Sequence, residues 1–188
     1  MRRVKLNFVL VSLLLLMTRC SDFYSTGLWF HKPDGYKDET NPLTSYLGMS
    51  WNGLIIVNTI ICLIALTAFY YYSFHYRPKS LTAKPKNIFE YISICYFNEP
   101  GKYFQSLYRI PKDLKTTAGH VGYILIRVMI FGGIIATAHN LCQYYKVGFY
   151  DSFRTIVGRP LFVIYGLFFL SFFYFQFQLA RKEFRQLK

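Results

Sequence analysis

Three polar residues interrupt the first apolar stretch of the chain at spacings that bring them onto one helix face. Arg19, Asp22 and Thr26 are three and four positions apart, and residues at these separations are neighbours on an α-helix. A guanidinium and a carboxylate so placed can neutralise each other, or the carboxylate can take part in proton or cation binding. One interpretation is a helix end whose charges reach into the lipid headgroups. The other is that Asp22 points into a helical bundle, where an ionisable residue marks a functional site.

A second polar group follows in the next loop. Glu39 and Asn41 stand just before Pro42, and proline holds the residue before it in an extended geometry. Both side chains can then cap the helix that begins there. His139, near the end of a later apolar stretch, is expected at the same membrane level. With Asp22 it completes a candidate proton- or cation-binding cluster, whose simpler alternatives are helix capping and a hydrogen-bonded interfacial histidine.

Known catalytic and metal-binding motifs do not occur in the sequence. There is no Walker loop, nucleophile elbow, His-Glu-x-x-His or Cys-x-x-Cys pattern. The four cysteines lie far apart, which predicts neither a disulfide framework nor a zinc site. His75 and His120 stand at the ends of apolar stretches, too close to the edge for a haem held between two histidines. We therefore assign no catalytic residue, cofactor or metal.

Four apolar stretches must position these residues. They cover about residues 6–30, 53–74, 121–144 and 161–179 of the 188-residue chain. The last three each reach the roughly 20 residues that cross a bilayer, and their backbones must be helical because unpaired amides are costly in lipid. With 53% hydrophobic and only 16% charged residues, the sequence predicts an all-α fold: a single membrane domain, 1–188, built as a polytopic bundle of four transmembrane helices.

One further charge, Arg127, lies about two turns inside the third stretch. An unpaired arginine at mid-depth costs at least about 2.5 kcal/mol even on insertion scales. We expect its side chain to face another helix or to reach the cytoplasmic headgroups.

The Lys and Arg residues indicate which side each loop faces. Three lie in the first five residues, eight between Arg77 and Lys115 and four in the tail after Ala180, whereas the two other loops hold five together. The positive-inside rule then places both termini and the loop 77–119 in the cytoplasm. We expect the cell membrane as the location, in a bacterium the cytoplasmic membrane.

The net charge of +13 would suit nucleic-acid binding. The positive residues, however, lie beside the membrane on one side, where anionic headgroups are the expected counterions. We therefore exclude nucleic acid and expect the lipid bilayer, with anionic headgroups on the cytoplasmic side, as the partner. A membrane-protein partner or a second copy of the chain is also compatible with the sequence.

The loop 77–119 has an amphipathic part. Large apolar residues recur at helical spacing with Lys and Arg between them: Tyr103, Phe104, Leu107, Tyr108 and Ile110. The pattern predicts an amphipathic helix lying on the inner leaflet, with a docking face for a partner as the alternative. In the third apolar stretch, Gly132 and Gly133 are each followed four residues later by a small residue, which predicts a close approach of helices.

The first apolar stretch also has the outline of a signal peptide. Three basic residues precede twelve apolar ones that end at Met17. Apolar character resumes at Phe23 and continues to Phe30, which favours a retained helix over a cleaved one.

The pattern Asp22-x3-Thr26 followed by Glu39-x-Asn41-Pro42 resembles a family of small bacterial integral membrane proteins that is known only as a domain of unknown function. The resemblance covers about residues 18 to 60. It implies a bundle of a few helices with a polar cluster at the outer end, and it implies no activity.

Our functional hypothesis is a non-enzymatic membrane component that binds a partner, a lipid or an ion at its outer face. The candidate polar cluster is Arg19, Asp22, Thr26, Glu39, Asn41 and His139. The alternative is a small intramembrane enzyme or carrier for lipid-like substrates, in which Asp22, Glu39 and His139 would perform the acid–base steps.

The topology can be tested by cysteine labelling of intact cells. A membrane-impermeant thiol reagent should reach an engineered cysteine at position 34, in place of Asp34, and should not reach one that replaces Lys86. Labelling at position 86 and not at position 34 would show that the chain has the opposite orientation.

Overall fold

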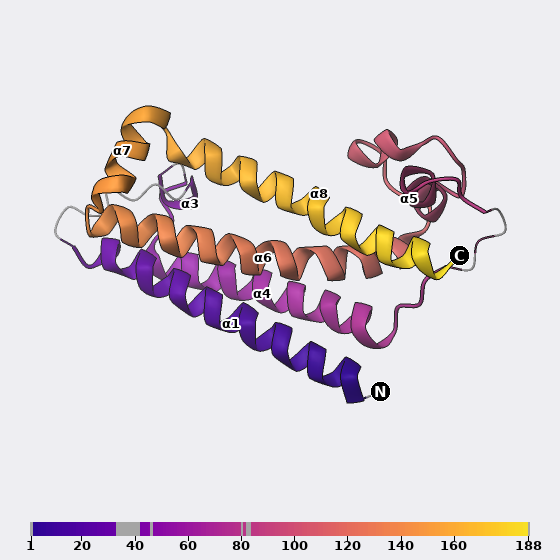
Figure 1. Cartoon of the computed structure of the whole chain (residues 1–188). Coiled ribbons are helices and arrows are strands. Elements are labelled where there is room, and N and C mark those ends of the chain that lie inside the picture. Colours follow the sequence, from indigo (N-terminus) through magenta and orange to yellow (C-terminus); the bar gives the residue numbers. More distant parts are fainter. Residues whose placement is uncertain (1, 33–41, 46, 80, 82–83, 188) are drawn as a thin grey trace. The chain divides into compact units, whose positions relative to one another are not determined.

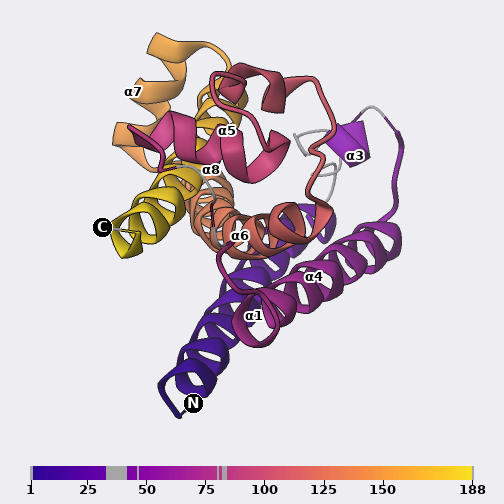
Figure 2. The same cartoon turned by 90° about the vertical axis from the view of Figure 1, so that its right-hand side faces the viewer.

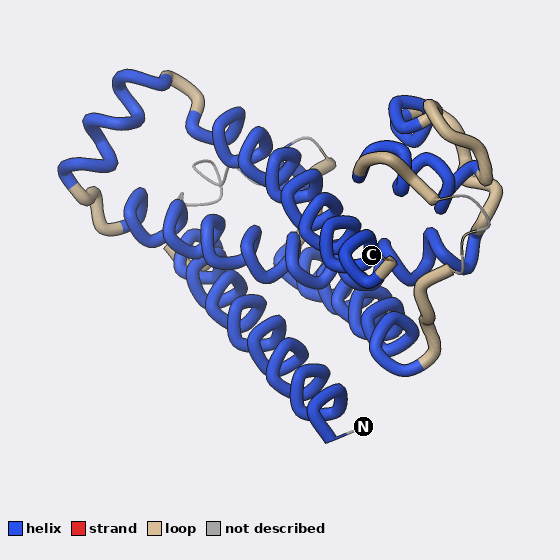
Figure 3. The backbone as a smooth tube through the Cα atoms, turned by 45° about the vertical axis from the view of Figure 1, so that its right-hand side comes forward, coloured by secondary structure: helices blue, strands red, loops and turns tan. Residues whose placement is uncertain are grey.

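Helices make up all of the regular structure in the part of the chain that the structure describes. The computed structural model describes residues 2–32, 42–45, 47–79, 81 and 84–187 (Figure 1). Within these ranges there are helices and loops and no strand (Figure 3). The long helices are α1 (Arg2–Phe30), α4 (Trp51–Phe74), α6 (Leu114–Tyr144) and α8 (Pro160–Gln186). All four are long and apolar enough to cross a membrane, which confirms the predicted all-α fold with four membrane-spanning helices.

All four helices extend beyond the predicted apolar stretches, and α6 and α8 extend furthest, by about two turns each. The helix α6 begins at Leu114 rather than at 121, because the side chain of Asp113 accepts a hydrogen bond of 3.0 Å from the Thr116 amide and caps the added turns. The helix α8 continues past 179 to Gln186 through Ala, Arg, Lys, Glu and Gln residues, all of which favour helix. Hydropathy marks the part of a helix that sits in lipid, and it does not mark these polar ends.

The long helices carry most of their apolar side chains on their outer surfaces. Only 11% of the most apolar windows of α1 and α8 is buried, against 44% for α6. Leu13, Ile60 and Phe169 are each more than half exposed, which would be unfavourable in water and is expected in lipid. The helix α6 is therefore the most buried of the four long helices, and the other three expose a larger share of their surface to lipid.

The chain divides into two compact units. Unit 1 comprises residues 1–8, 65–127 and 172–188, and unit 2 comprises residues 9–64 and 128–171. Each long helix contributes one part of its length to each unit. Unit 1 holds the beginning of α1 and the end of α8, the arrangement expected when an even number of spans places both termini on the same side. Its assignment to the cytoplasm stays a prediction.

Unit 1 has its own core, built on the short helix α5 (Ile88–Phe97). Asn87 caps the start of α5 by accepting a 2.9 Å hydrogen bond from the Glu90 amide, and Asn98 ends it in the left-handed conformation. Figure 2 shows α5 beside the C-terminal end of α8. The buried cluster between them consists of Tyr91, Ile92, Cys95, Tyr96, Phe97 and Ala180.

The segment after α5 differs from the predicted amphipathic helix. The structure has a five-residue 3-10 helix, η1 (Tyr103–Leu107), and an irregular chain from Tyr108 onward. Gly101, with φ +75°, and Pro111 bound the segment, and proline disfavours the α conformation at the residue before it. The apolar side chains of Phe104, Leu107, Tyr108 and Ile110 remain exposed, so the segment keeps an apolar surface without a regular helix.

A further element, α7 (Gly148–Val157), lies in the loop between the third and fourth spans, where the sequence analysis expected none. Its Tyr150 is buried, whereas Phe149 and Ile156 are more than 70% exposed. The sequence nevertheless carries a helical signal here, because apolar residues recur at helical spacing: Phe149, Tyr150, Phe153, Ile156 and Val157. The short helix α3 (Pro42–Ser45) completes the set of described elements.

Glycines of α6 allow its neighbours to approach closely. A Cβ at Gly122 would collide with the Ala68 carbonyl group of α4, and one at Gly119 would enter the Tyr76 ring. At Gly132 the nearest atoms belong to the Phe168 ring, at 3.1 Å. The close approach predicted from the small residues of α6 is therefore present, and its tightest backbone contact is at Gly122.

We predict that Gly122→Ala destabilises the protein by about 3 kcal/mol, the upper end for overpacking, because the obstacle is backbone and cannot rotate away. Gly166→Ala on α8 is the matched control, since a Cβ there meets nothing within 4 Å among the described residues. Thermal unfolding in detergent should show a clear loss for the first variant and none for the second. Equal midpoints would refute the close approach.

Candidate functional site

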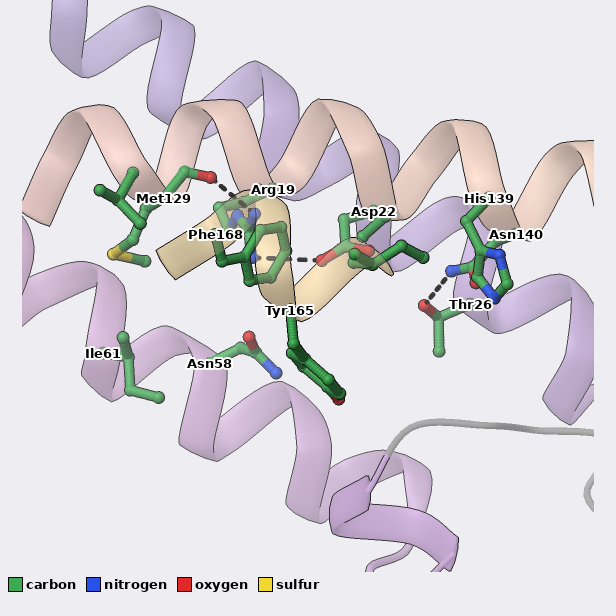
Figure 4. Close-up of a pocket in the computed structure, with 14 residues that line it drawn as sticks. Arg19, Asp22, Thr26, Asn58, Ile61, Met129, His139, Asn140, Tyr165 and Phe168 are labelled. Atoms are coloured by element: carbon green, nitrogen blue, oxygen red, sulfur yellow. Dashed lines mark hydrogen bonds and ion pairs between the residues drawn. The ribbon is translucent and has the colours of Figure 1, made fainter. Parts of the chain in front are cut away.

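The described part of unit 2 contains a cavity of about 310 Å³ to which all four long helices contribute (Figure 4). Polar side chains line it from three helices: Arg19, Asp22 and Thr26 from α1, Asn58 from α4, and His139 and Asn140 from α6. The lining also contains apolar side chains, among them Ile61, Ile164 and Phe168. A mixed polar and apolar lining within candidate membrane spans is the main feature of this site.

Arg19 and Asp22 form an ion pair at the cavity wall. Arg19 Nη1 lies 3.2 Å from Asp22 Oδ2, and the two side chains are 13% and 19% exposed. Arg19 Nη2 also donates a 2.8 Å hydrogen bond to the Met129 carbonyl oxygen of α6. Gly133 makes that reach possible, because a Cβ there would collide with the guanidinium. The pair is therefore neutral overall and is attached to the backbone of a second helix.

Asn140, another residue of the cavity wall, links α6 to α1. Its Nδ2 donates to Thr26 Oγ1 at 3.0 Å and to Ser25 Oγ at 3.2 Å. Figure 4 shows Thr26 next to His139 and Asn140. The Nδ1 atom of His139 contacts the Tyr150 hydroxyl of α7, while its Nε2 atom is buried without a partner among the described residues. The helix α7 thus orients the histidine and leaves one ring nitrogen free.

The structure brings four of the six predicted site residues to this one cavity: Arg19, Asp22, Thr26 and His139. Glu39 and Asn41 lie outside the described residues, so their convergence with Asp22 stays a prediction. Asn58 and Asn140 were absent from the predicted cluster. Their signal in the sequence is an amide within a predominantly apolar span. Arg127, the other predicted intramembrane charge, belongs to unit 1.

The electrostatics of the cavity disfavour a cation. Its carboxylate, Asp22, is already paired with Arg19, so a cation would have to displace a positive charge. Among the described residues, no group of three or more His, Cys, Asp or Glu side chains could hold a metal ion. Asn58 donates its Nδ2 to the Leu54 carbonyl oxygen at 2.9 Å, which leaves its amide oxygen to accept from a bound molecule.

Unit 1 contains a second polar cluster, which is almost fully buried. His120 Nε2 lies 3.0 Å from Glu183 Oε2 and 3.0 Å from the Tyr76 hydroxyl, and Nδ1 lies 3.1 Å from the Tyr96 hydroxyl. The Tyr91 hydroxyl donates to Glu183 Oε2 at 2.8 Å. His120 is 1% and Glu183 4% exposed. The cluster joins α5, α6 and α8 to Tyr76, which lies just after the end of α4.

Burial sets the protonation of the phenols in this cluster. It raises the pKa of Tyr96 to about 12 and also raises the pKa of Tyr76 and Tyr91. All three hydroxyls therefore stay protonated at neutral pH. A proton on His120 Nε2 can be donated to Glu183 while Nδ1 accepts from Tyr96. This cluster was not predicted from the sequence, although His120 stands at the end of an apolar stretch and Glu183 is the single acid of the basic tail.

The chain matches no family model, no curated protein and no solved structure. The functional conclusion therefore comes from the geometry of the two units.

We predict that Asp22→Asn destabilises the protein by about 2.5 to 3.5 kcal/mol, the insertion cost of a central arginine left without its counter-charge. Adding Arg19→Met should recover part of this loss, because the double variant buries no charge. A double-mutant cycle by thermal unfolding measures the coupling, with Ser21→Ala as an exposed control on the same helix. Strictly additive losses would mean that the pair contributes nothing.

Proposed function

We propose that this protein is a non-enzymatic multi-pass membrane component that binds the polar group of a lipid or lipid-like molecule in the unit 2 cavity. The observation that carries the proposal is the mixed lining of that cavity. Arg19, Asn58 and Asn140 supply polar groups, and Ile61 and Phe168 supply apolar surface. An amphiphile can contact both kinds of group at once, whereas a simple ion can contact only the polar ones.

The net charge of the cavity wall limits the classes of ligand that it can bind. Since Arg19 and Asp22 neutralise each other, the cavity offers no net charge, which favours a neutral or zwitterionic polar group. Hydroxyl, ester and amide groups can exchange hydrogen bonds with the amide of Asn58 and with the hydroxyl of Thr26. Under the predicted topology, unit 2 contains the outer ends of the four spans, so the ligand would enter from the outer leaflet.

An acid–base role is the second candidate. It is favoured by one observation: Asp22 lines the same cavity as His139, whose Nε2 has no partner among the described residues. Against it, the Asp22 carboxylate is held by Arg19 and the other nitrogen of His139 is engaged by Tyr150. In an enzyme or carrier, Asp22→Asn would abolish turnover or transport in protein that still expresses normally. In a binding protein, the same change lowers stability and ligand retention together.

We predict that filling the cavity removes a bound lipid. Ala136 lines the cavity, and Ala136→Leu adds apolar volume there without deleting any polar group. Ile134→Phe is the control, because Ile134 is 53% exposed on the same helix and does not line the cavity. Both variants should keep thermal midpoints close to that of the wild type.

The measurement is native mass spectrometry after exchange into detergent that contains phosphatidylethanolamine or diacylglycerol. Retention should fall at least about tenfold in Ala136→Leu, equivalent to about 1.4 kcal/mol, and should be unchanged in Ile134→Phe. Equal retention by both variants would exclude the cavity as the binding site. Retention that depends only on Asp22 charge would favour the acid–base alternative.

A further inference from the structure

We propose that a second cavity, in unit 1, binds a phosphate group, either that of an anionic lipid headgroup or that of a soluble phosphate compound. This cavity has a volume of about 440 Å³. Its wall carries four positively charged side chains, here called the four-cation group: Arg3, Arg77, Arg127 and Lys182. Each comes from a different part of the chain: α1, the residues after α4, α6 and α8.

The positive charge of this cavity is not neutralised by the described residues. None of the ion pairs formed among them includes a member of the four-cation group. The carboxylate in the cavity wall is that of Glu183, which is 4% exposed and is engaged by Tyr91 and His120. Four cations around one buried carboxylate leave a clear positive excess, so the expected occupant is an anion.

Two of the guanidinium groups are held in place by one hydrogen bond each among the described residues. Arg127 donates Nη1 to the Tyr123 carbonyl oxygen at 2.9 Å, and its Cζ lies 3.5 Å from the centre of the Tyr123 ring. Arg77 donates Nη1 to the Tyr76 carbonyl oxygen at 2.9 Å. A guanidinium has five N–H donors, so each can still present a two-pronged face, which matches the oxygens of a phosphate.

Neutral groups of the same wall add to the fit. The hydroxyl of Ser73, another residue of the wall, is buried without a partner among the described residues. The Tyr76 hydroxyl is held by His120 at 3.0 Å, and burial raises its pKa, so it stays a donor rather than a competing anion. Val4 and Tyr72 give the cavity apolar sides against which the glycerol portion of a lipid can pack.

The test removes two members of the four-cation group. It compares the resulting variant with a control variant of the same net charge. The site variant is Arg77→Gln with Lys182→Gln. The control is Arg109→Gln with Arg181→Gln, which removes two exposed cations that do not line the cavity. Any general attraction to anionic membranes changes equally in the two proteins.

The probes are phosphatidic acid and diacylglycerol, which differ by the phosphate alone. Retention of phosphatidic acid by full-length protein, measured by native mass spectrometry, should fall at least about tenfold in the site variant, equivalent to about 1.4 kcal/mol. The control variant should retain it, and the wild type should prefer it to diacylglycerol. Equal losses in both double variants would overturn the site, as would a wild type without that preference.

A second arm distinguishes the two sources of phosphate. If inorganic phosphate raises the wild-type melting temperature and displaces phosphatidic acid, a soluble phosphate compound is the occupant. If phosphatidic acid binds and inorganic phosphate does neither, the occupant is a lipid headgroup. If the site variant folds poorly, a second variant, Arg77→Lys with Lys182→Arg, keeps both positive charges. It is expected to prefer phosphatidic acid as the wild type does. Loss of that preference in a folded variant would overturn the proposal. All of these measurements are made in the Ala136→Leu background, in which the unit 2 cavity is filled, so that lipid bound in unit 2 does not contribute to the comparison.

Discussion

The buried contact between His120 and Glu183 constrains unit 1 more than any other polar interaction there. A carboxylate and an imidazole that are 4% and 1% exposed cost several kcal/mol to bury unless every polar atom finds a partner. Those partners are the phenols of Tyr76, Tyr91 and Tyr96, two of them on α5. The short helix α5 must therefore stay docked on α8, since its release would remove the Tyr91 donor from the buried acid and the Tyr96 partner from His120. The apolar cluster around Tyr91 and the buried polar contacts therefore stabilise the docking of α5 on α8 together.

The two cavities differ because their carboxylates have different partners. In unit 2, Asp22 pairs with Arg19 of the same cavity wall and cancels its charge. In unit 1, Glu183 is turned toward tyrosine and histidine, so the cations of the neighbouring cavity keep their charge. The contacts of the two acids therefore explain why the unit 2 cavity is neutral overall and the unit 1 cavity is positive. That difference supports distinct ligands, an uncharged polar group in one and a phosphate in the other.

Elements that depend on local pattern could be predicted from the sequence, and features that depend on distant contacts could not. Hydropathy located the four spans, and spacing placed Arg19, Asp22 and Thr26 on one helix face. The pairing of Glu183 with His120 joins residues 63 positions apart, which no local pattern encodes. The helix α7 was detectable from the helical spacing of its apolar residues, but the contact of its Tyr150 with His139 was not. The segment after Gly101 had helical spacing, but the two residues that bound it shortened it to η1.

The close contact at Gly122 has a consequence for how relatives of this chain would diverge. Leucine, isoleucine and phenylalanine on a lipid-facing surface can replace one another at little energetic cost, so most of α1 and α8 is free to drift. A position where any side chain meets the Ala68 carbonyl group tolerates only glycine, and the same holds for Gly133 while Arg19 must reach Met129. Over long evolutionary times, two glycines, one ion pair and one buried acid would outlast the hydrophobic residues that make up most of the chain.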